Sequence, residues 1–200
     1  MRILIRELIE TVILALMIFL VLQFSVQNFR VEGSSMEPNL EEGHYLLVNK
    51  LVYLRFSPDE VNVFASLMSD DVSETVYPFH APKLGEIIIF HYPRDPSRDF
   101  VKRVIGVPGD VVEIDDGQVI LNGEALDEPY LDRLDRSSME PLRIPRDSYF
   151  VMGDNRRASN DSRDWGVVPA ENIIGRAWVG YWPLDKLRTL VAFPTSLLSF

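Results

Sequence analysis

The 200-residue chain contains no cysteine. This absence excludes disulfide bridges, a catalytic thiolate and cysteine-ligated zinc sites. Histidine is also scarce, and none of the three (His44, His80 and His91) stands in a recognisable triad motif. A triad is defined by geometry rather than by spacing, so a serine–histidine–aspartate arrangement stays open. Each histidine is otherwise expected at the surface or at a strand edge.

Basic residues are in the minority, with 20 Lys and Arg against 30 Asp and Glu and a net charge of -10. Residues 1–29 hold two of each sign, so the acidic excess lies beyond Phe29. Phosphate binding needs clustered Lys and Arg, and the absence of such a cluster argues against nucleic acid as a partner. We expect neither a metal nor another cofactor. The hydrophobic content of 46% is typical of a folded domain.

One stretch, residues 8–26, is almost wholly apolar and would span roughly 28 Å as a helix. It has no polar stripe, unlike most core helices, and no small-x-small cleavage site follows it, unlike a removable signal peptide. The sequence therefore predicts a flank over 1–7, a transmembrane signal anchor over 8–29 and a domain over 30–200. Arg2 and Arg6 precede the helix and only Arg30 follows closely, which favours a cytoplasmic N-terminus and a domain on the outer side of the membrane.

Beyond residue 30 the pattern favours strands, and we expect a mainly β, antiparallel domain. Asp115-Asp116-Gly117 between two apolar runs predicts a hairpin. The stretches near 57–82 and 123–147 have the composition of inserted surface loops, and the apolar tail over 190–200 is too short to span a membrane. The predicted strands are 45–48, 86–92, 100–107, 110–114, 118–121, 149–152 and 173–182.

Two residues are candidates for nucleophilic chemistry. Ser35 lies in Gly33-Ser34-Ser35-Met36-Glu37-Pro38, a turn that could hold a hydroxyl rigidly, although a plain loop leaving the membrane has the same composition. A serine needs a base, and lysine can serve if burial keeps it neutral. On a strand Lys102 shares a face with Phe100 and Val104, which would lower its pKa, whereas an ordinary strand lysine would reach solvent. Lys50 is the competing candidate and looks exposed.

A third polar stretch, residues 153–166, completes a set of motifs. These are Ser-Met-x-Pro at 35–38, Lys-Arg-Val-Ile-Gly-x-Pro-Gly-Asp at 102–110, and Gly-Asp-Asn-Arg-x-x-Ser-x-Asp-Ser-Arg at 153–163. With the apolar helix before them, they resemble type I signal peptidases, the membrane-bound serine–lysine endopeptidases of the signal-peptidase fold. The resemblance implies Ser35 as nucleophile, with its backbone N–H in the oxyanion hole, and Lys102 as general base. It also implies that Ser159 orients the lysine by a hydrogen bond, and that Asp161 and Arg163 brace the loop as an ion pair.

The chain departs from the family pattern at three places. Gly33 stands where some members carry a serine that donates to the oxyanion, Asn39 replaces the usual threonine, and Phe100 stands where some members carry a tyrosine. The resemblance implies exported preproteins as partners, with small residues at the first and third positions before the cut, and a site near the lipid bilayer. Three rivals stay open: a self-cleaving Ser/Lys repressor, a histidine-dependent membrane hydrolase, and a non-catalytic anchored β-domain that binds exported chains.

Overall fold

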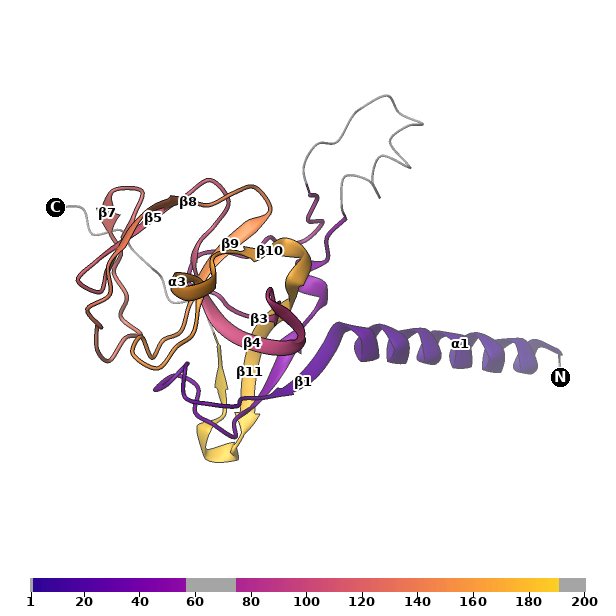
Figure 1. Ribbon diagram of the computed structural model, residues 1–200. Coiled ribbons are helices and arrows are strands. Elements are labelled where there is room, and N and C mark those ends of the chain that lie inside the picture. The colour runs from indigo at the N-terminus through magenta and orange to yellow at the C-terminus, as the bar shows by residue number, and fades with distance from the viewer. Residues whose placement is uncertain (1, 57–74, 191–200) are drawn as a thin grey trace, which may run out of the picture.

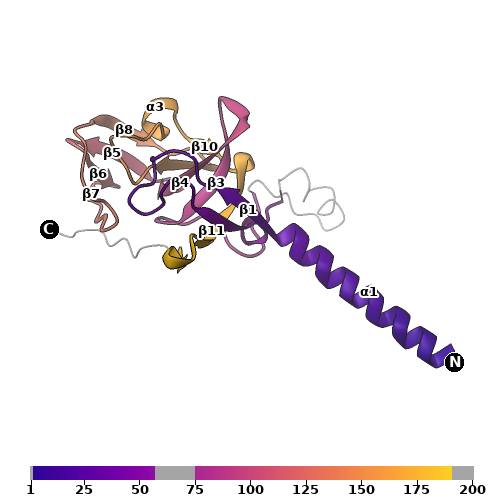
Figure 2. The ribbon, with the colours of Figure 1, turned by 90° about the horizontal axis from the view of Figure 1, so that it is seen from below.

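The computed structural model describes residues 2–56 and 75–190. A single long helix, α1 (Arg2–Ser25), extends away from a body built mainly of antiparallel strands (Figure 1, Figure 2). The prediction of a mainly β domain behind an N-terminal apolar helix is confirmed. The other described helical segments are short: η1 (Leu51–Tyr53), α3 (Ser162–Trp165), η2 (Ala170–Asn172) and η3 (Leu184–Lys186).

The larger sheet has eight strands in the order β1-β2-β11-β3-β4-β9-β10, with β12 paired to β11. Every pair in it is antiparallel. Its strands are β1 (Val26–Arg30), β2 (Tyr45–Asn49), β3 (Ile87–Tyr92), β4 (Asp95–Gly106), β9 (Ser148–Met152), β10 (Val168–Pro169), β11 (Ile173–Trp182) and β12 (Arg188–Thr189).

The smaller sheet has four strands in the order β7-β6-β5-β8. They are β5 (Val111–Asp115), β6 (Gln118–Leu121), β7 (Glu124–Ala125) and β8 (Met139–Arg143). The predicted hairpin joins β5 to β6, with Asp116 at φ 42° and Gly117 at φ 86° in its turn. Most residues of the stretch over 123–147 are exposed or half-buried, as expected of a surface segment. The stretch also supplies β7 and β8, and three of its side chains, Leu126, Tyr130 and Ile144, are buried in the core.

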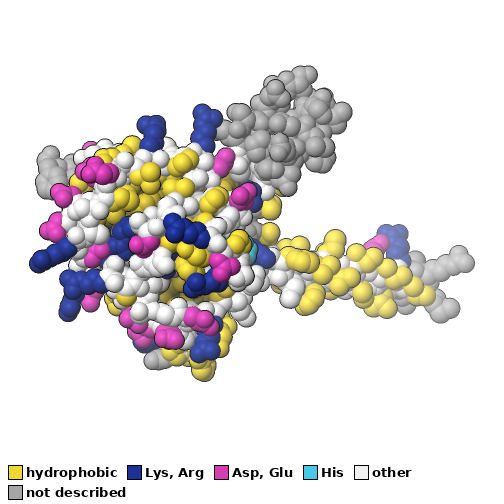
Figure 3. All heavy atoms as spheres, viewed as in Figure 1, with side chains coloured by type: hydrophobic (Ala, Val, Ile, Leu, Met, Phe, Trp, Pro, Cys, Tyr) yellow, Lys and Arg dark blue, Asp and Glu magenta, His cyan; other side chains and the backbone are white. Residues whose placement is uncertain are grey.

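Helix α1 carries exposed apolar side chains along its length, as Figure 3 shows for the visible face. Its segment Ile5–Ser25 is long and apolar enough to cross a membrane, which agrees with membrane association. The boundaries differ from the predicted ones. The helix already begins at Arg2, inside the expected flank, and residues 26–29 belong to β1 instead of the anchor, because Val26–Arg30 pairs with β2.

Strand β3 is buried on both faces, which explains why Ile87-Ile88-Ile89-Phe90 is continuously apolar. Ile87 and Ile89 pack in one cluster with Val31, while Ile88 and Phe90 pack in another on the opposite face. The first of these clusters supports the turn that carries Ser35. Of the two remaining unusual stretches, residues 57–74 and 191–200 lie outside the described residues.

Candidate active site

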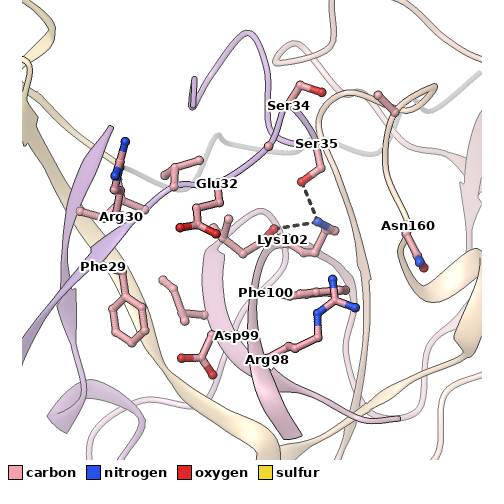
Figure 4. A pocket seen from close by; sticks show the side chains of 16 residues that line it. Phe29, Arg30, Glu32, Ser34, Ser35, Arg98, Asp99, Phe100, Lys102 and Asn160 are labelled. Carbon is pink, nitrogen blue, oxygen red and sulfur yellow. Dashed lines mark hydrogen bonds between the residues drawn. The ribbon is translucent and has the colours of Figure 1, made fainter. Parts of the chain in front are cut away.

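The structure brings Ser35 and Lys102 together. Ser35 lies in the turn between β1 and β2, and Lys102 lies on β4. Lys102 Nζ is 2.7 Å from Ser35 Oγ and 3.1 Å from the carbonyl oxygen of Val101 (Figure 4). In the same view the side chain of Ser34 points away from the amine. The two candidates from sequence, which are 67 residues apart, thus meet at hydrogen-bonding distance.

The turn that carries Ser35 is fixed by buried side chains of its own and by hydrogen bonds from the loop over 153–166. Met36 and Leu40 are fully buried in the core beneath it. From the side, Asn155 donates its backbone N–H to Ser35 O at 3.0 Å and its side-chain amide to Ser34 O at 3.1 Å. Both backbone carbonyls beside the candidate nucleophile are therefore fixed by one residue of the loop over 153–166.

Gly153 lets that loop approach the serine closely. A Cβ atom at this position would lie 2.4 Å from Ser35 O and 2.3 Å from Ser159 Oγ. Real Cβ atoms do not come so near to another heavy atom, so any side chain here would push the loop off the turn. The glycine is required by this contact between two segments.

Lys102 is only 4% exposed. Burial lowers its pKa from 10.5 to about 8, against the opposing effect of the Asp161 and Asp154 carboxylates. Its amine lies 5.3 Å from the centre of the Phe100 ring, which shares its strand face as the alternation predicts. Lys50, the rival candidate, is exposed and does not line the cleft at Ser35.

The loop over 153–166 is braced by a two-point ion pair. Arg163 Nε and Nη2 donate to the two oxygens of Asp161 at 2.8 and 2.9 Å. Asp161 also caps α3 and accepts the backbone N–H of Gly153 at 3.0 Å. Burial by itself would raise the pKa of Asp161, but the Arg163 guanidinium holds it below its usual value. The carboxylate therefore stays charged and links the start of the loop to its end.

The structure does not form the predicted hydrogen bond between Ser159 and Lys102. The amine is directed to Ser35 Oγ and Val101 O instead. Ser159 Oγ is buried beside Gly153, and it has no hydrogen-bond partner of normal geometry in the described part of the chain. The predicted bond is therefore absent from the described structure, and a role for Ser159 stays a prediction.

Two buried residues that the sequence did not single out lie next to the dyad. Arg103 Nε and Nη2 donate to Asp154 at 2.8 and 2.7 Å, and both side chains are almost inaccessible. Asn39 Nδ2 donates to the same carboxylate at 2.9 Å, so the residue that replaces the family threonine joins the turn to the loop. The sequence did contain a signal for this pair. Arg103 shares its strand face with the apolar Val101 and Ile105, which predicts burial, and a buried guanidinium needs a carboxylate partner.

The segment over 126–137 contacts the loop over 153–166 through two ion pairs. Glu128 pairs with Arg156, and both side chains are buried. Asp135 Oδ2 accepts from Arg163 Nη1 at 2.5 Å, on the far side of the guanidinium from Asp161. A stretch read from sequence as a surface loop thus supplies two carboxylates to the arginines of the candidate site.

None of the three histidines lines the cleft at Ser35. His44 lies directly before β2, at the strand start where it was expected, but it is buried and not at the surface, and its Nδ1 accepts the backbone N–H of Glu41. His80 contacts Glu86 at 3.0 Å, and His91 contacts Asp99 at 2.8 Å. Within residues 2–56 and 75–190 no group of His, Asp and Glu is arranged to hold a metal ion.

A cleft of about 660 Å³ opens beside the Ser35–Lys102 pair. One wall is the segment over 29–33, which begins in β1 and continues beyond its end at Arg30, and the other is the part of β4 over 98–102 (Figure 4). Strand β4 pairs with β9 only from Arg103 onward, so its edge along this wall is not paired by β9. The cleft is therefore a groove with backbone on both sides and the two reactive groups at one end.

Comparison with known proteins gives consistent matches. A family model described as signal peptidase, peptidase S26, matches residues 5–182. Signal peptidase I of Leptolyngbya laminosa is 40% identical over 146 residues, covering 68% of this chain and 71% of the relative. Probable signal peptidase I-1 of Synechocystis is 35% identical over 197 residues, covering 94% and 88%. Signal peptidase I of Pseudomonas fluorescens is 33% identical, covering 89% and 73%.

Proposed function

The chain belongs to the signal peptidase family, peptidase S26, and is a peptidase of the kind that cleaves signal peptides; we propose that Ser35 is its nucleophile and Lys102 its general base. The observation that carries the proposal is that the amine of Lys102 is buried and its Nζ lies 2.7 Å from Ser35 Oγ. With a pKa of about 8, roughly a tenth of the amines are neutral at pH 7, against about one in 3,000 at the usual 10.5.

The first step is attack on the scissile carbonyl. In the neutral amine, one N–H donates to Val101 O while the nitrogen lone pair accepts the Ser35 hydroxyl proton. The serine oxygen bonds to the substrate carbonyl carbon, the lysine becomes an ammonium, and that proton passes to the leaving amine as the peptide bond breaks. Water then attacks the acyl-enzyme with Lys102 again taking a proton, and Ser35 leaves with its hydroxyl restored.

The developing oxyanion needs fixed donors. The backbone N–H of Ser35 bonds to no acceptor in the described chain and is our candidate. One such donor typically contributes about 3 kcal/mol to the transition state. Gly33 has no side-chain hydroxyl to add a second. Ser159 remains a supporting residue in this proposal through its position beside Gly153, and Asp161 with Arg163 supports the loop through the ion pair.

The substrate segment is proposed to bind as an extended strand in the groove between residues 29–33 and 98–102. Backbone groups on both walls would pair with it, which suits a peptidase that accepts many exported preproteins. The inner face of the groove carries Phe29, Val31 and Val101, which belong to or pack against the core cluster. Shallow apolar sites there would accept small residues at the first and third positions before the cut.

The proposal places α1 across the membrane, with the N-terminus in the cytoplasm and the β domain on the outer side. Ser35 follows the end of α1 at Ser25 by only ten residues, so the two are at most about 35 Å apart along an extended chain. The nucleophile would then act close to the bilayer surface, where signal peptides emerge.

The test is cleavage of a model preprotein by the full-length protein in detergent micelles. We expect Ser35→Ala, Lys102→Ala and Lys102→Arg each to lose activity by about a thousandfold or more, since arginine cannot give up its proton. Lys50→Arg is the matched control and should cleave normally. Full activity in any of the three site variants would remove that residue from the proposed chemistry, and loss of cleavage in His44→Ala with an intact fold would favour a histidine base.

A further inference from the structure

The groove wall over 29–32 alternates in character. Phe29 and Val31 pack against or within the core, whereas Arg30 and Glu32 are exposed. Both charged side chains line the groove, and Figure 4 shows the Glu32 carboxylate lying between this wall and β4. An apolar inner face and a charged outer face therefore meet along a single extended segment.

Glu32 has no partner within the described chain. No hydrogen bond or ion pair reaches its carboxylate from residues 2–56 or 75–190. Arg98 lines the same groove, but its guanidinium lies 5.2 Å from the centre of the Phe100 ring instead of pairing with Glu32. Arg30 is likewise without an ion pair in residues 2–56 and 75–190. The groove thus contains a carboxylate whose charge nothing in the described structure neutralises.

The alternation of a strand decides which substrate side chain meets this carboxylate. A peptide lying beside residues 29–33 has its own side chains pointing alternately to the inner and outer faces. On the proposed function, the first and third residues before the cut point inward, to the side of Val31. The second residue then points outward, to the side of Glu32, since opposite residues of paired strands share a face.

We propose that Glu32 is a specificity residue, which favours a basic side chain and disfavours an acidic one at the second position before the cut. This inference rests on the proposed function, because it takes its register from the site at Ser35. The expected contrast is modest, since a pair of this kind is solvent-exposed: about two- to fivefold in kcat/KM between lysine and glutamate substrates. The contrast should shrink at high ionic strength, because salt screens exposed charges.

The experiment uses three model preproteins that differ only at this second position, with lysine, glutamine or glutamate. The readout is the ratio of kcat/KM for the lysine substrate to that for the glutamate substrate, which does not depend on how much of a variant is folded. We expect a ratio above one for the wild type, near one for Glu32→Gln, and below one for Glu32→Lys. Glu42→Lys carries the same change in net charge away from the groove and should keep the wild-type ratio.

Two results would overturn the inference. One is a ratio in Glu32→Lys equal to that of the wild type, and the other is an equal change in Glu42→Lys, which would reveal only the field of the whole protein. Failure of the proposed function is recognised separately, with the glutamine substrate. If Ser35→Ala still cleaves it, the nucleophile is wrong whatever the charge ratios are.

Discussion

Burying an amine for catalysis should make the fold less stable, and Lys102→Met tests this. Methionine has a similar length and no charge, so it fills the same space without the cost of desolvating an ammonium. We expect the variant to be inactive and yet more stable than the wild type at pH 7. Stability and activity should therefore change in opposite directions at one residue.

The magnitude follows from the pKa of Lys102, which is 10.5 in an unfolded chain and about 8 in the folded protein. Below pH 8 both states bind the proton, and the folded state is penalised by roughly 3 kcal/mol, since a tenfold change in acidity corresponds to about 1.4 kcal/mol. Between pH 8 and 10.5 the unfolded chain binds more protons, so the wild type gains stability as the pH rises. Val101 O loses a donor in the variant, which offsets about 1 kcal/mol.

A net gain of about 2 kcal/mol at pH 7 should raise the melting temperature by roughly 4 to 8 °C for a chain of this size. The measurement is thermal unfolding of full-length wild type and Lys102→Met in detergent, from pH 6 to 10.5. The advantage of the variant should be constant up to about pH 8 and then decline. Lys50→Met, at an exposed lysine, should show no such advantage. An advantage that is absent at pH 7, or that does not change with pH, would refute the reasoning about the buried amine.

Three further outcomes are expected. The kcat/KM of the wild type should rise about tenfold per pH unit below pH 8 and level off above it, since only the neutral amine of Lys102 acts as base; a limb near pH 6.5 would indicate a histidine instead. Asp135→Asn should lower kcat several-fold with little change in KM, because Arg163 loses one of its two carboxylate partners. Asp132 has no ion pair in the described structure, so Asp132→Asn is the control and should behave as wild type. Gly153→Ala should reduce activity by at least tenfold in a protein that still folds, because its Cβ would displace the loop from Ser35; unchanged activity would contradict this close approach of the loop to the turn.

Local sequence was enough for the elements that depend on neighbouring residues. The apolar run predicted α1, and the alternation and β-branched runs predicted five of the eight strands of the larger sheet and two of the four of the smaller one. The Asp116-Gly117 turn predicted the hairpin, because its backbone conformation suits those residues. Local sequence failed where pairing with a distant segment decides the structure. Residues 26–29 followed an apolar helix without a breaker, and only pairing with β2 shows that they form a strand.

The stretch over 123–147 shows a different limit. Its charge and proline content are typical of a surface loop, yet Glu128 and Asp135 are carboxylates whose partners, Arg156 and Arg163, lie 28 residues away in each case. The sequence does not distinguish a carboxylate that faces water from one that is paired with a guanidinium. Only the packing of the segment over 126–137 against the loop over 153–166 decides between the two.

By itself, the sequence determined that a serine and a lysine were present in motifs able to hold them, on a turn and on a strand. The tertiary structure decided the protonation equilibrium of that lysine, because burial and the nearby Asp161 and Asp154 set its pKa. It also decided that the amine contacts Ser35 and Val101 rather than Ser159. Desolvation and contact distances depend on segments far apart in the chain, and no spacing of residues along the sequence contains them.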